Sequence, residues 1–201
     1  MSKTHPVETL RRAIAAGAVV LGENKVQEAE SKIVELGRHS AEWHLIGHLQ
    51  SNKARRAVQL FDVIQSVDSL ELARRLERIC EEEGRDELPV FVQVDLAAEE
   101  TKSGISEGEL PPLVEYLKTC KHLRFEGLMI LPPFFDDPEA TRPYFKRLTA
   151  IRDEMVLAGA FTNSRGELSM GMSHDFEVAI EEGATAIRVG TSIFGEREYQ
   201  R

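Results

Sequence analysis

Short apolar segments alternate with segments of helical periodicity along the whole chain. The clearest apolar run covers residues 89–95, and its nearly continuous hydrophobicity is typical of a strand buried on both faces. The predicted strands are residues 18–21, 43–46, 63–67, 89–95, 123–131, 168–170 and 186–189. The predicted helices are residues 6–17, 25–36, 52–61, 70–83, 110–119, 139–158 and 174–182. Expected end signals flank several of them, including Pro6 at a first helical position and Ser69 as an N-cap.

Strict alternation of strands and helices predicts parallel strands joined by right-handed crossovers. A closed (β/α)8 barrel needs eight strands and usually runs to about 250 residues, so an eighth strand placed just before Lys3 would complete it. The alternative, an open doubly wound sheet, needs no further strand, but the sequence lacks its Gly-rich first turn. We favour the barrel, formed by residues 1–201 as a single domain.

Composition narrows the class of protein. The formal net charge is −9, and an acidic chain repels phosphate backbones, so nucleic acid is not an expected partner. No apolar run is long enough to span a bilayer and no leader pattern is present, so a membrane is not expected either. The two cysteines, Cys80 and Cys120, lack metal-ligand spacing and are expected to be reduced thiols in a cytoplasmic protein.

Small and hydroxyl residues follow the last two predicted strands. Gly171, Ser173, Gly190 and Thr191 offer hydroxyls and backbone N–H groups near the start of the predicted helix at residues 174–182. A helix N-terminus in such surroundings binds phosphate through N–H donors and the helix dipole. In barrels, phosphate sites recur in the loops after the seventh and eighth strands. The alternative is that these glycines only turn the chain.

Lys3 would lie at the end of the completing strand, beside the predicted phosphate site. A lysine there could form a Schiff base with a carbonyl cofactor, which requires burial or a nearby cation to keep the amine neutral. Arg188, on the last strand, would point into the barrel and supply that cation. The alternatives are a solvated terminal lysine and an ion pair between Arg188 and an acid. His44 and His48 have no third ligand nearby, so no metal site is expected.

Several motifs, in this order along nearly the whole chain, resemble those of the pyridoxal-phosphate homeostasis proteins. They are Ser2-Lys-Thr-His-Pro6, Gly22-Glu-Asn24, Trp43-His-Leu-Ile-Gly47, Ser66-Val-Asp68, Gly127-Leu-Met129, Leu168-Ser-Met-Gly-Met-Ser173 and Arg188-Val-Gly-Thr191. The resemblance implies a (β/α)8 TIM barrel of the fold-type III kind, like the N-terminal barrel of alanine racemase. It also implies pyridoxal 5′-phosphate (PLP) as the cofactor, held as an aldimine.

The resemblance assigns roles to individual residues. Lys3 matches the Schiff-base lysine, and Arg188 matches the arginine that faces the pyridine nitrogen. Ser173, Gly190 and Thr191 match the phosphate binders, with the Met172 backbone beside them. The positions that line the ring are matched by Asn24, His44, Ser66 and Met129. No catalytic residue and no metal ligand are assigned.

A fixed guanidinium at Arg188 disfavours protonation of the ring nitrogen facing it, which makes the ring a weaker electron sink. Together with the resemblance, which implies a monomer, this favours as the expected function a cytoplasmic carrier or regulator of PLP and of linked amino- and keto-acid metabolism, not an enzyme. Apo PLP-dependent enzymes are its expected partners. The alternatives are a PLP-dependent amino-acid racemase and a truncated barrel with impaired PLP binding.

The chain departs from the family pattern at its start. Family members carry a helix and an apolar first strand before the lysine, and we expect this chain to lack both as an N-terminally truncated barrel. The neighbouring strands would then have exposed edges. Lys3 would lie on a flexible terminus with near-normal amine chemistry.

Overall fold

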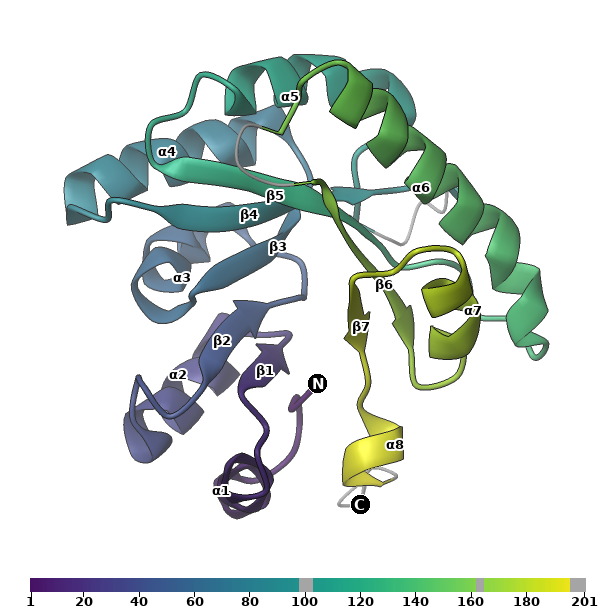
Figure 1. Ribbon diagram of the computed structural model, residues 1–201. Helices are drawn as coiled ribbons and strands as arrows, with labels where there is room; N and C mark the ends of the chain where they lie inside the picture. The colour runs from purple at the N-terminus through teal and green to yellow at the C-terminus, as the bar shows by residue number, and fades with distance from the viewer. Residues whose placement is uncertain (98–102, 162–164, 196–201) are drawn as a thin grey trace.

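The computed structural model describes residues 1–97, 103–161 and 165–195, and its centre is a curved sheet of parallel strands (Figure 1). The strands are β1 (Val20–Glu23), β2 (Glu42–Leu45), β3 (Val63–Val67), β4 (Leu88–Val94), β5 (Leu123–Ile130), β6 (Glu167–Met172) and β7 (Ala186–Arg188). Their order in space is their order in sequence, and every neighbouring pair is parallel. A doubly wound sheet reverses strand order at a switch point. The order found here excludes that alternative and confirms the predicted α/β barrel.

Helices cover the outer face of the curved sheet (Figure 1). The α-helices are α1 (Val7–Ala15), α2 (Val26–Leu36), α3 (Ala54–Leu60), α4 (Leu70–Glu83), α5 (Leu110–Leu117), α6 (Arg142–Leu157), α7 (Phe176–Glu181) and α8 (Thr191–Phe194). Short 3-10 turns precede three of them, η1 (Ser51–Lys53), η2 (Glu107–Glu109) and η3 (Pro138–Thr141). The predicted N-cap is confirmed, since the Ser69 side chain accepts a hydrogen bond from the Leu72 N–H. Helix α8 was not predicted.

The apolar core has two parts. The larger part lies between the sheet and the helices and contains side chains from both. The smaller part consists of Val63, Phe91 and Met129, with Leu131 against them. All of these except Leu131 belong to strands, which places this small cluster inside the barrel. No helix within the described ranges is long and apolar enough to cross a membrane.

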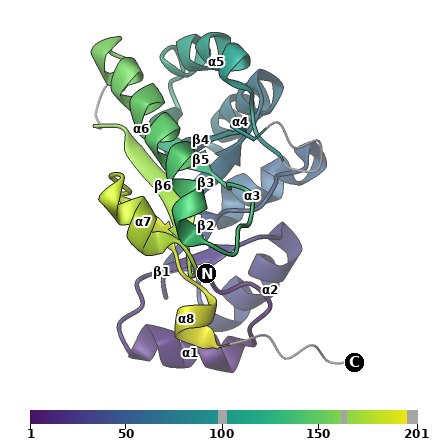
Figure 2. The same ribbon diagram turned by 90° about the vertical axis from the view of Figure 1, so that its right-hand side faces the viewer.

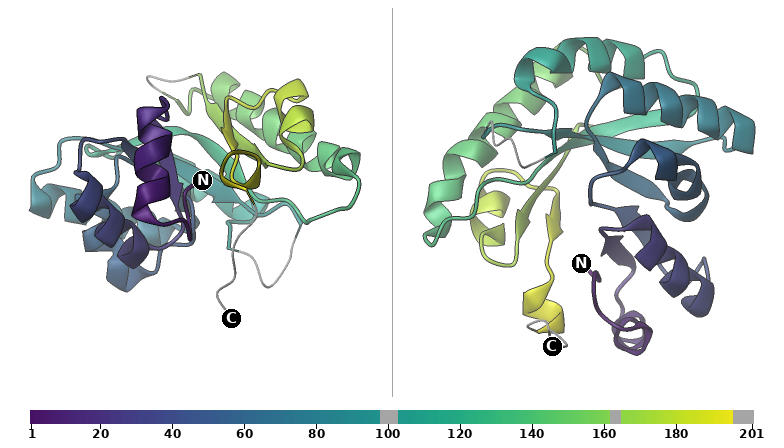
Figure 3. Two further views of the ribbon diagram at one scale, coloured as in Figure 1. Left: turned by 90° about the horizontal axis from the view of Figure 1, so that it is seen from below. Right: turned by 180° about the vertical axis from the view of Figure 1, so that it is seen from behind.

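The start of the chain lies between β1 and β7 (Figures 2 and 3). The Ser2 N–H donates to the Gly22 carbonyl of β1 at 2.9 Å. The Met1 amino group donates to the Val189 carbonyl just after β7. Ser2 is fully buried. The expectation that Lys3 lies on a flexible terminus is therefore wrong, because the residue before it is bonded to the sheet. Val19, Val20 and Ile187 beside this segment are exposed, as expected for sheet edges.

We expect Gly127→Ala to destabilise the barrel, because the backbone of β6 lies directly against this residue of β5. A Cβ at Gly127 would lie 1.9 Å from the Glu167 carbonyl oxygen, and backbone cannot yield as a flexible side chain does. The cost should be about 1–3 kcal/mol or more, as for other forced overpacking. Urea unfolding measures it. Gly108→Ala, with open space around the new methyl group, is the matched control. Equal stability of the two variants would contradict this account.

Candidate functional site

The interior of the barrel holds a cavity of about 260 Å³. Its wall is formed by β1, β2, β3, β6 and β7 together with Met1, and its polar members are His44, Gln65, Ser169 and Arg188. A second hollow of about 330 Å³ lies between α5 and α6 outside the barrel, and no candidate residue lines it. Of the candidate residues, His44 and Arg188 line the barrel cavity.

Arg188 is the buried cation of this cavity. It is 5 % exposed, and it donates from Nη1 to Ser169 Oγ at 2.8 Å and from Nη2 to the Ile130 carbonyl at 2.6 Å. Its Nε has no hydrogen-bond partner among the described residues. Burial lowers the pKa of the guanidinium to about 10, partly offset by Asp175, so it remains cationic at neutral pH. Neither of these two hydrogen-bond acceptors is charged. The alternative, in which Arg188 forms an ion pair with an acidic side chain, therefore does not describe these contacts.

The turns after β6 and β7 meet as predicted. The Gly190 N–H donates to Ser173 Oγ at 2.9 Å, and the Ser192 N–H lies 3.5 Å from the same oxygen. Gly171 has a positive φ of 89°, and a Cβ there would lie 2.6 Å from the Ala179 methyl group, so the turn requires glycine. Thr191 begins α8 beside Gly190. This arrangement unites Ser173, Gly190 and Thr191.

The Met172 backbone has a different local role. Its N–H donates to Asp175 Oδ1 at 2.6 Å, and the Asp175 N–H returns a bond to the Met172 carbonyl at 3.1 Å. The Met172 N–H is thus occupied by the side chain that closes the turn into α7. This leaves Ser173 and the Gly190–Thr191 turn as the polar groups of this corner.

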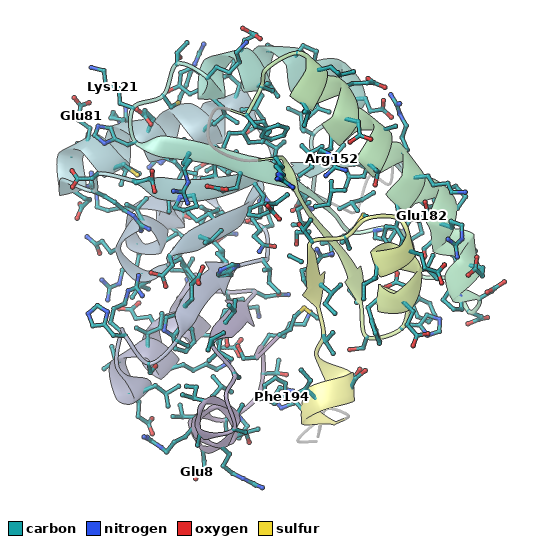
Figure 4. All side chains as sticks on the ribbon, viewed as in Figure 1. Glu8, Glu81, Lys121, Arg152, Glu182 and Phe194 are labelled. Atoms are coloured by element: carbon teal, nitrogen blue, oxygen red, sulfur yellow. The ribbon has the colours of Figure 1, made fainter. Side chains whose placement is uncertain are left out.

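The segment containing Lys3 contacts the same corner. Met1 lies against Gly190, where an added Cβ would be 3.5 Å from the Met1 Cε. The His5 ring stacks on Phe194 of α8 with centroids 4.8 Å apart. Figure 4 labels Phe194, which lies on the side of α8 that faces α1. Lys3 itself is half-buried between these contacts. An amine-bearing segment at one end of the chain and a hydroxyl-bearing turn near the other end are thereby side by side.

A buried ionic cluster fixes this segment from the other side. Lys32 Nζ in α2 lies 2.8 Å from Glu23 Oε1, 2.7 Å from Glu28 Oε1 and 2.9 Å from the Ser2 carbonyl. Ser2 Oγ donates to Glu23 at 2.6 Å. The Thr4 N–H donates to Glu28, and Thr4 has a positive φ of 66° that this bond holds in place. We call Glu23, Glu28 and Lys32 the anchoring cluster.

The pKa values of the anchoring cluster reflect burial and pairing. Burial raises the pKa of Glu23 above its ordinary value, although the bonds from Lys32 and Ser2 work against that rise. Burial also opposes ionisation of Glu28, but Lys32 and the Thr4 N–H outweigh it and hold the Glu28 pKa below its ordinary value. Glu23 is therefore the member of the cluster whose ionised form is disfavoured by burial, and the bond from Lys32 offsets part of that cost.

The remaining candidates lie around the same barrel. His44 lines the cavity wall, and its two ring nitrogens contact Gln65 and Glu42. Asn24 lies in the turn between β1 and α2. Ser66 on β3 is fully buried and its Oγ has no partner within the described ranges. Met129 on β5 belongs to the small interior cluster.

The structure does not extend the histidine pair into a metal site. His48 bonds Asp68, and no cluster of three potential metal ligands occurs among residues that the structure describes.

Sequence reasoning missed the residues that hold the candidates in place. Gln65 and Ser169 interrupt apolar strands, which is a usable signal for an interior polar contact. Lys32 follows Glu28 by four residues on a helix, which predicts only an ordinary surface pair. Its burial against β1 could not be read from that spacing.

Comparison with known proteins gives consistent results. Residues 2–198 match the family model described as "Alanine racemase, N-terminal domain". The "Pyridoxal phosphate homeostasis protein" of Aquifex aeolicus is 42% identical over 198 residues, covering 98% of this chain and 86% of the relative. The protein of the same name from Escherichia coli K12 is 39% identical over 211 residues, covering 100% of this chain and 86% of that one.

Solved structures agree with these relatives. PipY of Synechococcus elongatus with PLP bound superposes with a TM-score of 0.88 at 42% identity, covering 96% of this chain and 90% of PipY. An alanine racemase of Clostridium difficile has a TM-score of 0.74 at 17% identity over 96% of this chain and 49% of its own. The second likeness concerns the fold alone.

We expect Lys32→Met to destabilise the protein by about 3–5 kcal/mol at pH 7, the usual cost of removing one partner of a buried ion pair. Without Lys32, the pKa of Glu23 rises further above its unfolded value, so the folded state binds the proton more tightly than the unfolded state. Stability should therefore increase as the pH falls from 7 toward 5. Urea unfolding at both pH values measures this.

The matched control is Lys118→Met, which removes a more exposed pair with Glu115. It should cost no more than about 1 kcal/mol and show no such recovery at lower pH. A Lys32→Met variant that loses stability equally at both pH values would count against the assigned role of Glu23.

Proposed function

The chain belongs to the pyridoxal phosphate homeostasis protein family, and from that membership we propose that it binds PLP in its barrel cavity as a carrier and regulator, not as an enzyme. The single observation that supports this proposal is that three groups adjoin the end of β7. They are the segment bearing Lys3, the Ser173–Gly190 turn and the buried cation Arg188. An aldehyde, a phosphate and a pyridine nitrogen need those three partners.

The residues present fit the cofactor chemically. The Ser173 hydroxyl accepts from the Gly190 N–H, so its own proton remains available to a phosphate oxygen. Thr191 adds a hydroxyl and a backbone N–H beside it. Arg188 has a buried Nε without a partner in the described part of the chain. In this proposal Asn24, His44, Ser66 and Met129 line the ring, and the Met172 backbone supports the turn.

Lys3 supplies the covalent attachment in this proposal. Bound PLP would supply an aldehyde, and the role of Lys3 in this step would be to hold that aldehyde covalently through its amine. The anchoring cluster orients the segment for this step by bonding the Ser2 carbonyl and the Thr4 N–H on either side of Lys3. The backbone on both sides of Lys3 is thus held by hydrogen bonds, and this sets the position of the lysine.

Arg188 favours storage over turnover. PLP supplies an electron sink for carbanion chemistry, most strongly when its ring nitrogen is protonated. A guanidinium with a pKa of about 10 stays charged at neutral pH, and a cation facing that nitrogen disfavours its protonation. The names of the curated relatives, which describe homeostasis, agree with this. As part of the same proposal, the protein acts as a monomer that passes PLP to apo-enzymes.

We expect added PLP to give a visible imine band that borohydride fixes as a stable adduct on Lys3. Lys3→Arg keeps the charge but cannot form the imine, so it should lose the band and the adduct. The matched control is Lys25→Arg, at an exposed lysine that is the N-cap of α2, which should keep both. Absorbance and peptide mass spectrometry make the measurement. Absence of a band in the unaltered protein, or an adduct on another lysine, would overturn the proposal.

A carrier should exchange the Cα proton of alanine far more slowly than a racemase does. We therefore expect deuterium wash-in at Cα, followed by NMR in deuterated buffer, to remain close to the rate given by free PLP. A rate that depends on protein concentration and greatly exceeds that background would favour the racemase alternative.

A further inference from the structure

A continuous chain of hydrogen bonds crosses the barrel interior and ends on Arg188. Arg188 on β7 contacts Ser169 on β6 at 2.8 Å, and Ser169 Oγ contacts Gln65 Oε1 on β3 at 2.7 Å. Gln65 Nε2 lies 2.8 Å from His44 Nδ1 on β2, and His44 Nε2 lies 2.9 Å from Glu42 Oε1. We call these five residues the relay. Because β4 and β5 separate β3 from β6, the Ser169–Gln65 bond spans the interior and does not follow the wall.

The relay has one direction, and the guanidinium sets it. Arginine donates and never accepts, so Ser169 Oγ accepts from Arg188 and must send its own proton to Gln65 Oε1. The Gln65 amide then directs an N–H to His44 Nδ1, which accepts. The His44 proton is therefore on Nε2, where it is donated to the Glu42 carboxylate. Each assignment follows from the preceding one.

The reversed amide would leave one buried proton, that of Ser169, without an acceptor. It would turn Gln65 Nε2 toward Ser169, whose hydroxyl already accepts from Arg188, and the Ser169 proton would lose its acceptor. Gln65 and Ser169 are 3 % and 0 % exposed, so water does not compensate for that loss. The direction is thus held by burial at both residues.

We propose that Gln65 is a positioning residue for the cofactor site. It fixes the Ser169 hydroxyl so that one N–H of Arg188 is always taken, and it holds His44 in the Nε2–H tautomer at the cavity wall. The inference deepens the proposed function and rests on it, since Arg188 and His44 are taken to face the cofactor. Gln65 itself need not touch the cofactor.

The first test needs no cofactor. Imidazole nitrogen shifts measured by 15N NMR should show His44 as the Nε2–H tautomer in the unaltered protein, with the signal assigned by its loss in His44→Gln. Gln65→Glu is nearly isosteric but presents only acceptors to His44, so Nδ1 should become protonated. Gln65→Leu should allow a mixture of tautomers. An unaltered protein with the proton on Nδ1, or no change in either variant, would overturn the relay.

The second test uses PLP. Gln65→Leu and Ser169→Ala should each shift the absorbance maximum of bound PLP and weaken its binding about three- to tenfold, the range that one buried hydrogen bond carries. Gln93→Leu is the matched control, because Gln93 is equally buried on β4 but lies outside the relay. It should leave the spectrum and the His44 tautomer unchanged.

The two tests separate the two proposals. If the tautomer responds to Gln65 but PLP does not bind the unaltered protein, the relay stands and the proposed function fails. If PLP binds and its spectrum is the same in Gln65→Leu as in Gln93→Leu, Gln65 does not position the site and the inference fails.

Discussion

The contact between the Lys32 ammonium and the Ser2 carbonyl is the interaction on which the site depends most. Lys32 is buried only because Glu23 and Glu28 compensate its charge, and the same ammonium then binds the backbone next to Lys3. A buried ion pair seldom contributes much net stability. What the buried ion pair provides is a fixed orientation. A buried charge has no water to bind it, so only a few arrangements of the protein groups around it are favourable. The anchoring cluster therefore specifies where the first residues lie against β1.

A second constraint comes from the opposite side of the barrel. β7 provides Arg188, and the residues directly after it provide the Val189 carbonyl and the Gly190 N–H, which contact Met1 and Ser173. Two segments at opposite ends of the sequence are thus joined through backbone groups. The first residues of the chain lie along the edge strand β1, and Gly190 belongs to the turn after β7. A shift of the first residues or of that turn would therefore change the distance between Lys3 and the hydroxyl-bearing turn.

The sequence predicted the fold well because the strand signal is local. Residues 63–67 were expected as a strand and are one, and Ser69 was expected to cap the next helix and does so. The contact of the first residues with the segment after the last strand also followed, once sequential strands were assumed to close. The relay did not, because Ser169 and Gln65 are 104 residues apart and meet across the interior. The anchoring cluster was missed for a related reason, since helical spacing cannot show which face is buried.

The two groups that accept hydrogen bonds from Arg188 are both uncharged, which explains why this cavity suits an anionic or electron-rich ligand. A carboxylate partner would cancel most of the guanidinium charge within the barrel, where the low dielectric strengthens pairing. Ser169 and the Ile130 carbonyl instead satisfy two N–H groups with dipoles, and the net charge remains. Glu42, the carboxylate at the far end of the relay, is separated from Arg188 by three neutral side chains. A ligand that enters the cavity therefore meets a fixed cation whose charge Asp175 offsets only in part, and a phosphorylated pyridine can bind against such a charge.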